Sequence, residues 1–174
     1  MRILVTGGVR SGKSSHAEAL LEGAPGVTYV APGRPADGTD PDWDTRVALH
    51  RDRRPATWRT VETVAVDDIL RRAEGPVLVD CLGTWLTAVL DTGQLWEASA
   101  AQLHAVVATR LAAVCDALAV AREVILVTNE VGLGVVPEHR SGRVFRDLLG
   151  TVNQEVAAVC DEVHLVIAGR VLKL

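Results

Sequence analysis

The chain is poor in aromatic residues and has no excess of basic ones. Its 174 residues include one tyrosine, one phenylalanine and four tryptophans, and the formal net charge is −4. Proteins that bind nucleic acids usually present a basic surface and aromatic platforms on which bases stack. We therefore expect no nucleic-acid partner.

Cysteine is also scarce, and its spacing argues against a structural use. Cys81, Cys115 and Cys160 are odd in number and far apart, without a C-x-x-C pair. Disulfide frameworks and zinc sites use paired, closely spaced cysteines. We expect buried free thiols, which suit the reducing cytoplasm.

The sequence lacks the marks of export and of membrane insertion. The first residues enter an apolar strand without the basic start and cleavage site of a signal peptide. We see no apolar run of membrane-spanning length. We expect no membrane span, and the length and 48% hydrophobic content predict one domain over residues 1–174.

Short apolar runs rich in valine and isoleucine alternate with helical patterns. The runs predict buried strands at 3–6, 27–31, 76–80, 123–128 and 162–168. Helices are predicted at 13–22, 42–53, 83–90, 97–121 and 141–160. This alternation predicts an α/β fold with a mostly parallel sheet covered on both faces. Gly169 and Arg170 lie between two apolar runs and predict a final hairpin with an antiparallel edge strand.

Two polar stretches interrupt this pattern, at 32–59 and 129–143. Each follows a predicted strand, so each should lie at the carboxyl edge of the sheet. Ligands bind at that edge in open α/β sheets, and long loops there often carry function.

The stretch GGVRSGKS at residues 7–14 stands between the first strand and the first helix. Its fixed positions match the phosphate-binding motif G-x-x-x-x-G-K-[ST], namely Gly7, Gly12, Lys13 and Ser14. The glycines let successive backbone N–H groups curl around phosphates, the lysine reaches the terminal phosphates, and the serine hydroxyl suits Mg²⁺. The motif predicts nucleotide binding, but it serves kinases, GTPases, motor ATPases and transferases alike.

Asp80 ends the apolar run PVLVD and should emerge at the same sheet edge as the phosphate loop. It therefore fits the second magnesium-binding acid of such proteins, although an ordinary aspartate at a strand end is the alternative. The chain has only two lysines, Lys13 and Lys173, and neither follows an asparagine. Without an N-K-x-D guanine clamp, a Ras-like switch is disfavoured.

The first polar stretch contains a histidine among arginines. A helix from about residue 42 places Trp43, Val47 and His50 on one stripe, and Arg46, His50 and Arg53 in an adjacent row. Five arginines lie within fourteen residues, at Arg46, Arg51, Arg53, Arg54 and Arg59. Guanidinium groups bind phosphates bidentately, so an anion-binding surface is predicted. A solvated helix face in ion pairs with neighbouring aspartates is the alternative.

A neutral imidazole can attack phosphorus directly and form a phosphoramidate. Nearby arginines would offset the phosphate charge and disfavour the protonated ring, which cannot attack. We assign this role to His50. His139, in the second polar stretch, is the rival, and His16, His104 and His164 are expected to be structural.

These stretches together resemble the bifunctional adenosylcobinamide kinase / adenosylcobinamide-phosphate guanylyltransferase family of cobalamin biosynthesis. The resemblance covers nearly the whole chain, and its specific motifs are H-R-x-x-R-P…W-R-T from His50 and N-E-V-G-x-G-x-V-P-E from Asn129. It implies phosphorylation of the aminopropanol hydroxyl of adenosylcobinamide, followed by transfer of GMP from GTP through a guanylylated histidine, His50. The chain departs from the family pattern at Gly83, Ala88 and His139, which bears on substrate contacts rather than on the chemistry.

The resemblance also implies a fold, an assembly and a set of contacts. The fold is a P-loop NTPase sandwich of three layers, like that of RecA-type recombination ATPases, and the assembly is a homotrimer. The catalytic residues are His50 and Lys13, the metal ligands for Mg²⁺ are Ser14 and Asp80, and the nucleotide is GTP, or ATP in the kinase step. The implied nucleotide contacts are Gly7, Gly8, Val9, Arg10, Ser11, Gly12, Lys13, Ser14, Ala31, Pro32, Gly33, Arg51, Asp52, Arg53, Arg54, Glu62 and Asp80.

Two other functions fit the residues alone. A plain small-molecule P-loop kinase needs the phosphate loop and the arginines but no nucleophilic histidine. A nucleotide-gated binding module needs no chemistry at all. Detection of GMP attached covalently to the protein separates the bifunctional enzyme from both.

Overall fold

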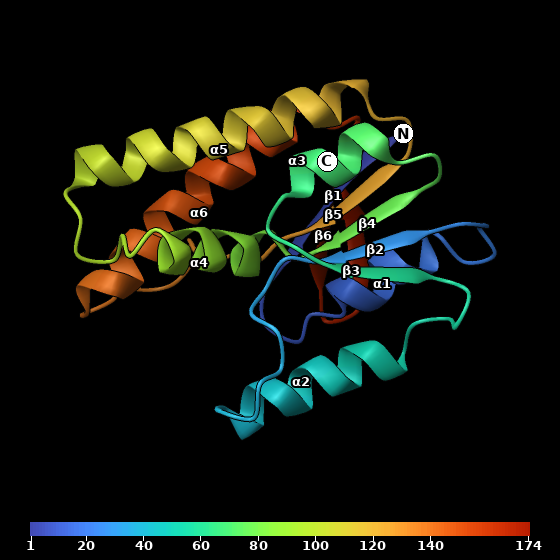
Figure 1. Cartoon of the computed structure of the whole chain (residues 1–174), viewed down its shortest axis with the longest axis horizontal. Helices are drawn as coiled ribbons and strands as arrows, with labels where there is room; N and C mark the ends of the chain where they lie inside the picture. The colour runs from blue at the N-terminus through green and yellow to red at the C-terminus, as the bar shows by residue number, and fades with distance from the viewer.

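One mixed sheet runs through the centre of the molecule (Figure 1). The computed structural model describes the backbone of residues 1–174 and the side chains of all residues except Arg46. Within this described chain, seven strands pair in the order β3-β2-β4-β5-β1-β6-β7. All neighbours are parallel except β6 and β7, which form the predicted antiparallel edge hairpin.

The predicted apolar runs form strands because each is short, rich in β-branched residues and buried wholly or in part, whereas the two edge strands β3 and β7 are mostly exposed. The strands are β1 Arg2–Gly7, β2 Thr28–Ala31, β3 Arg59–Glu62, β4 Val77–Asp80, β5 Val124–Val127, β6 Glu162–Ile167 and β7 Arg170–Lys173. The helices are α1 Lys13–Ala19, α2 Pro41–Asp52, α3 Val66–Arg72, α4 Leu82–Thr92, α5 Ala100–Val120 and α6 Arg140–Val159.

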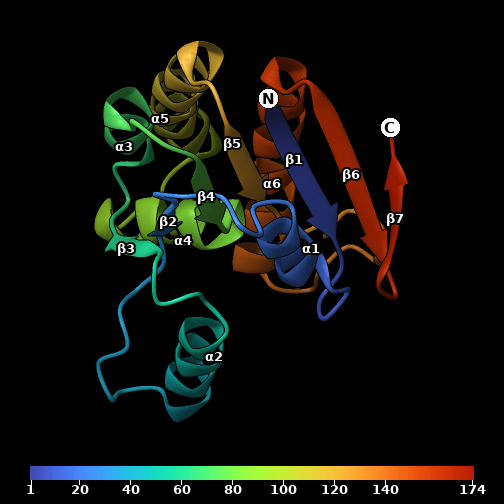
Figure 2. The same ribbon diagram turned by 90° about the vertical axis from the view of Figure 1, so that its right-hand side faces the viewer.

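Helices cover both faces of the sheet, as the alternation predicts. Successive strand residues point to opposite faces, so Ile3 and Val5 pack with α1 while Leu4 packs with α3, α4, α5 and α6. Figure 2 shows α1 on one side of the strands and the long helices α5 and α6 on the other. The three-layer sandwich is confirmed.

Two elements are absent from the sequence prediction. Strand β3 lies at the sheet edge and is mostly exposed, so it carries no apolar run that would reveal it. Helix α3 has seven residues and buries only Val66 and Leu70, which is too short a pattern to stand out.

Two expectations need correction. The three cysteines are free, as expected, but lie half-buried rather than in the core. Helix α5 is also long and apolar enough to cross a membrane by length and composition, so the expectation that no run reaches this length is wrong. Its apolar residues have a role in the fold, because Leu103, Val107 and Leu111 recur at helical spacing and are buried against the core.

The carboxyl ends of the parallel strands meet at one edge of the sheet. Strands β1 and β6 point toward this edge in Figure 2, and α2 lies beyond it, away from the layers of the sandwich. The described residues of α2 belong to neither core cluster. The fold therefore places the phosphate loop, the end of β4 and α2 around one space.

Candidate active site

The phosphate loop has the backbone shape that its glycines predict. A side chain at Gly7 would meet the carbonyl oxygen of Val166 at 2.4 Å, and Gly12 has φ +95°, in the left-handed region that favours glycine. The loop is also held from outside, because Gly169 of the β6–β7 turn donates its N–H to the carbonyl of Ser11 at 2.8 Å. Only glycine fits Gly7 without displacing β6.

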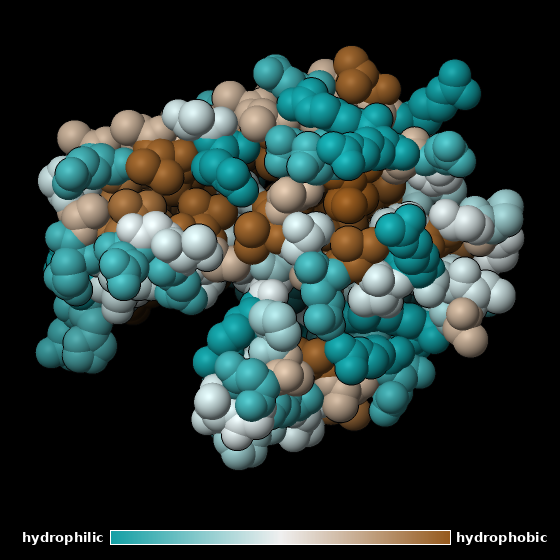
Figure 3. All heavy atoms as spheres, in the orientation of Figure 1, coloured by the Kyte–Doolittle hydropathy of each residue, from teal (hydrophilic) through white to brown (hydrophobic). Residues whose placement is uncertain are grey.

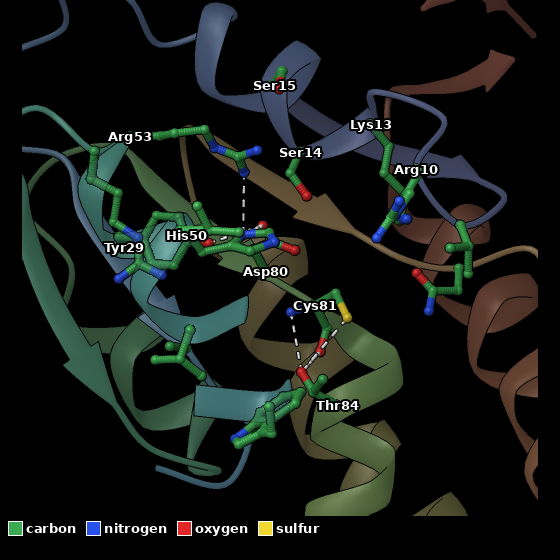
Figure 4. A pocket seen from close by; sticks show the side chains of 18 of the residues that line it. Arg10, Lys13, Ser14, Ser15, Tyr29, His50, Arg53, Asp80, Cys81 and Thr84 are labelled. Atoms are coloured by element: carbon green, nitrogen blue, oxygen red, sulfur yellow. Dashed lines mark hydrogen bonds and ion pairs between the residues drawn. The ribbon is translucent and has the colours of Figure 1, made fainter. Parts of the chain in front are cut away.

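The loop borders a cavity of about 380 Å³. Lys13, Ser14 and Arg10 line it, and Figure 4 shows these side chains extending into the same space. The amine of Lys13 donates to the Gly8 carbonyl at 3.2 Å, so its charge lies inside the curve of the loop. These groups can surround an anionic polyphosphate.

The segment that follows strand β2 forms the second side of the cavity. A side chain at Gly33 would meet Thr84 and the ring of Trp43 at 3.2 Å, so glycine lets α2 approach the start of α4. The indole N–H of Trp43 donates to the Arg34 carbonyl at 2.9 Å. Asp40 begins α2, because its carboxylate accepts the N–H of Trp43 at 3.0 Å.

Helix α2 brings His50 into the cavity with the phosphate loop. His50, Trp43, Val47 and Arg53 all line the cavity, as the predicted stripe and arginine row require. The imidazole is 38% exposed, and its Nδ1 lies 3.5 Å from Oδ2 of Asp80. Figure 3 shows the α2 side of the molecule as a separate lobe, with a deep notch between it and the rest.

Asp80 lies at the centre of the site and is nearly buried, with a side chain 6% exposed. The hydroxyl of Tyr29 donates to its Oδ2 at 2.9 Å. Burial by itself would raise the pKa of the Asp80 carboxyl. The imidazole of His50 and the hydroxyls of Tyr29 and Ser14 outweigh that effect, so the pKa lies below its ordinary value. Asp80 is thus an ionised acceptor.

A second carboxylate approaches from α1. Glu18 pairs with Arg53 at 3.3 Å, and the same guanidinium nitrogen lies 3.3 Å from Nδ1 of His50. Burial raises the pKa of Glu18, the charge of Asp80 adds to the shift, and Arg53 opposes it. The two neighbouring carboxyls therefore shift in opposite directions, with the pKa of Glu18 raised and that of Asp80 lowered.

The other predicted arginines take different positions. Arg54 lies over the ring of Tyr29, 3.5 Å from its centroid, and lines the cavity. Arg51 pairs with Glu62 at 2.7 Å. Arg46 lies on α2, but its side chain is outside the described part of the structure.

Most predicted site residues line this one cavity. They are Val9, Arg10, Ser11, Gly12, Lys13, Ser14, Ala31, Gly33, His50, Arg53, Arg54, Glu62 and Asp80. Those not found among the lining residues are Gly7, Gly8, Pro32, Arg51 and Asp52. The first two belong to the loop itself, Pro32 is buried, and Asp52 is exposed.

The rival histidine lies elsewhere. His139 is the exposed N-cap of α6 and is not among the residues found to line the cavity. His16 and His164 hydrogen-bond to each other at 2.9 Å, which agrees with a structural role.

Sequence reasoning missed Tyr29, Glu18 and Thr84. Glu18 follows Ser14 by four residues, so helical spacing places both on one face of α1 and could have revealed it. The contact between Tyr29 and Asp80 depends on the pairing of β2 with β4, which no short-range pattern in the sequence shows.

Two donor sets could hold a cation. The ligand atoms of Glu18, His50 and Asp80 lie within 4.8 Å of one another, but a metal there would occupy the imidazole. Ser14 and Asp80 offer a hydroxyl and a carboxylate close enough for the hydroxyl to lower the carboxyl pKa. Hard oxygen donors of this kind fit Mg²⁺.

The chain is similar to known proteins over its full length. A family profile described as cobinamide kinase / cobinamide phosphate guanyltransferase, CobU, matches residues 3–174. The protein of Salmonella typhimurium named bifunctional adenosylcobalamin biosynthesis protein CobU is 41% identical, and the alignment covers 100% of this chain and 99% of that protein. The protein of Pseudomonas aeruginosa named bifunctional adenosylcobalamin biosynthesis protein CobP is 37% identical, over 97% of this chain and 94% of its own length.

Two solved structures that resemble the chain are described as ATPases. One is described as a prototypical ATPase from the type III secretion system of pathogenic bacteria, with TM-score 0.57, 12% identity and 94% of this chain covered. Another is the assembled ATPase EscN from enteropathogenic E. coli, with TM-score 0.59, 11% identity and 96% of this chain covered. The chain spans about half or less of these two chains, 50% and 43%. At this identity the similarity concerns the fold.

Proposed function

The chain belongs to the family of cobinamide kinases / cobinamide phosphate guanyltransferases, and from this premise we propose that one cavity performs both reactions, with His50 as the covalent carrier of GMP. The protein is a bifunctional transferase of cobalamin biosynthesis. The observation that carries the covalent step is that His50 lines the same cavity as Lys13 and Ser14.

In the kinase step, the phosphate loop holds a nucleoside triphosphate, ATP or GTP. The hydroxyl of adenosylcobinamide attacks the γ-phosphorus, the hydroxyl proton is lost, and the nucleoside diphosphate leaves. Lys13 stabilises the charge that develops on the transferred phosphoryl group. This step needs no nucleophilic side chain.

In the guanylyl step, a ring nitrogen of His50 attacks the α-phosphorus of GTP. A nitrogen–phosphorus bond forms, the bond to the β-phosphate oxygen breaks, and pyrophosphate leaves with that electron pair. An oxygen of the corrinoid phosphate then attacks the same phosphorus, and the bonding pair returns to the nitrogen. Splitting the reaction this way means that the first nucleophile is uncharged, so two anions need not meet in that step.

Ser14 and Asp80 would hold Mg²⁺ in this site. When bound, the ion neutralises charge on the nucleotide's phosphates. Of the other implied nucleotide contacts, the cavity is lined by Ala31, Gly33, Arg53, Arg54 and Glu62, which supports their assignment.

The family resemblance also suggests a homotrimer, which sedimentation measurements test. The free cysteines are consistent with a reducing compartment such as the cytoplasm. A plain kinase remains the competing function, because the phosphate loop and the arginines suffice for it without a nucleophilic histidine.

Both activities are tested with the purified chain, adenosylcobinamide, GTP and Mg²⁺. Mass spectrometry of the corrinoid should detect the phosphate first and the GDP derivative afterwards. A product that stops at the phosphate, even when adenosylcobinamide phosphate is supplied directly, would identify a plain kinase. An unchanged corrinoid would contradict both activities.

A further inference from the structure

The Nδ1 atom of His50 faces two groups that require opposite positions of the ring proton. A guanidinium nitrogen of Arg53 lies 3.3 Å away, and Oδ2 of Asp80 lies 3.5 Å away. Arginine can only donate a hydrogen bond, and an ionised carboxylate can only accept one. A neutral imidazole has one N–H, so the two contacts exclude each other.

The choice between them decides whether the ring can react. If Nδ1–H donates to Asp80, the lone pair of Nε2 is free to attack phosphorus. If Arg53 donates to Nδ1, the proton is on Nε2 and the lone pair of Nδ1 is engaged. The contact with Asp80 therefore gives a nucleophile, and the contact with Arg53 gives an unreactive ring.

Glu18 determines where Arg53 lies. Its carboxylate, on α1, is 3.3 Å from the same guanidinium nitrogen that faces the imidazole. That nitrogen has two hydrogens, so it can donate to Glu18 and to Nδ1 together. The side chain of Glu18 is 14% exposed and that of Arg53 is 43% exposed, so the less exposed carboxylate holds the more exposed cation beside the ring. Figure 4 shows Arg53 extending toward His50.

We propose that Glu18 and Arg53 are positioning residues that hold His50 in its unreactive tautomer until the phosphates of a nucleotide attract Arg53. The inference rests on the proposed role of His50 as nucleophile. A nucleoside triphosphate offers Arg53 several charged oxygens in place of one carboxylate. Once Arg53 moves to them, Asp80 accepts the Nδ1 proton and Nε2 faces the nucleotide with its lone pair free.

This arrangement couples the nucleophilicity of His50 to the binding of the nucleotide. The hydroxyl of Tyr29 donates to Oδ2 of Asp80, the same oxygen that faces Nδ1 of His50, so Oδ2 is a fixed acceptor for the ring proton and Oδ1 is left for the proposed Mg²⁺. Arg53, at the end of α2 and partly exposed, is the group that changes partner. The histidine becomes nucleophilic when a polyphosphate is present beside it.

The test is the position of the His50 proton, observed by ¹⁵N NMR of histidine-labelled protein in mildly alkaline buffer, with the signal assigned by its loss in His50→Ala. The probe is a GTP analogue with a methylene bridge between the α- and β-phosphates, which binds without being cleaved. We expect the proton on Nε2 in the free protein and on Nδ1 with the analogue.

Glu18→Gln is the decisive variant, because it keeps the shape of the side chain and removes its charge. In the free variant the tautomer ratio should move toward Nδ1–H by about tenfold, the effect of one hydrogen bond to a charged group. Glu22→Gln, an exposed carboxylate just beyond α1, should leave the ratio unchanged. Arg53→Lys, which cannot span both partners as a planar group does, should shift the ratio in the same direction as Glu18→Gln.

The outcomes separate this inference from the function it rests on. A ratio that is the same with and without the analogue, or the same in wild type and Glu18→Gln, would overturn the tautomer switch even if GMP becomes attached to His50. Failure of GMP to attach to His50 in wild type would instead contradict the proposed function.

Discussion

The two sides of the cavity are built differently. We call residues 7–19 with the β6–β7 turn the phosphate-loop side, and residues 33–57 the α2 arm. On the phosphate-loop side, backbone bonds fix each turn, since Gly169 donates to Ser11 at 2.8 Å and Glu130 donates to Gly7 at 3.1 Å. Next to the phosphate-loop side, the buried side chain of His164 hydrogen-bonds to His16 and to Glu162. Its Nδ1 lies 2.9 Å from Nε2 of His16, and its Nε2 lies 2.8 Å from Oε2 of Glu162.

The α2 arm is held to the rest of the molecule mainly by side-chain contacts, of which the ion pair between Arg51 and Glu62 at 2.7 Å is the shortest described. Leu49 is 59% exposed, and the described residues of α2 are outside both core clusters. His50 and Arg53 reach their partners at 3.3–3.5 Å. The site thus combines a rigid phosphate holder with a reacting residue on a loosely attached helix.

This difference matches the two reactions. Both reactions need the nucleotide's phosphates held in one place, whereas only guanylyl transfer needs a side chain that approaches the α-phosphorus. Changes on the phosphate-loop side should therefore affect both activities, and changes on the α2 arm that displace His50 should affect mainly guanylyl transfer. The following experiments test that division, from the largest expected effect to the smallest.

Lys13→Ala should lower the rates of both reactions by about 10²–10³-fold, because it removes a charged donor from the developing phosphoryl charge. Steady-state assays of each step measure it. Lys173→Ala, the chain's other lysine, lies on β7 and pairs with Glu162 at the surface, so it should change neither rate. Guanylyl transfer at the full wild-type rate by Lys13→Ala would reveal a second nucleotide site, and would contradict the claim that the phosphate-loop side serves both reactions.

Leu78→Ala should lower the free energy of unfolding by about 3 kcal/mol, because it empties a fully buried position on β4. Leu49→Ala, the matched change on the α2 arm, should cost less than about 0.5 kcal/mol. Urea unfolding of both variants measures the difference. Equal losses would mean that α2 is as well packed as the sheet.

Asp40→Ala removes the N-cap of α2 and should weaken that helix by about 1 kcal/mol. We expect faster amide exchange in α2, guanylyl transfer slowed about fivefold, and a global unfolding midpoint close to that of wild type. Asp42→Ala, an exposed carboxylate of the same first turn, is the control. A kinase step slowed as much as guanylyl transfer would contradict the division of labour.

Asp161→Asn should have the smallest effect, and that effect should disappear in acid. Hydrogen bonds from Arg2 lower the pKa of the Asp161 carboxyl from 3.8 to about 2. Because the folded pKa is depressed, the pair stabilises the protein fully above pH 3.8 and loses this contribution as the pH falls toward 2. The stability difference between wild type and variant should shrink over that window. Asp116→Asn, which changes an exposed carboxylate on α5, is the control and should show no such pH dependence. A stability difference between wild type and Asp161→Asn that grows as the pH falls would contradict this prediction.

The sequence predicts the phosphate-loop side well, because its geometry follows from glycines and local backbone. Gly7 and Gly12 are required by a close carbonyl and a positive φ, both tied to the motif itself. Strand β3 and helix α3 escape prediction because an exposed edge strand and a two-turn helix bury too few apolar residues.

The α2 arm is predictable only in part. Helical spacing places His50 and Arg53 on the side that meets the cavity, and the structure agrees. The contacts of these residues with Asp80 and Glu18 join elements far apart in the chain, and such contacts depend on strand order rather than on spacing. This is why the contact between Tyr29 and Asp80 emerges only from the structure, whereas the spacing of Glu18 from Ser14 is visible in the sequence.

The most direct test of the central claim is the intact mass of the chain after incubation with GTP and Mg²⁺. The account predicts a mass increase of one GMP in wild type. The adduct should survive alkali and be lost in acid, because protonation of the bridging nitrogen makes it a good leaving group. His50→Ala should show no increase and should keep much of its kinase activity, and His139→Ala should behave as wild type. An acid-labile GMP adduct on His50→Ala would contradict the assignment of His50 as the nucleophile.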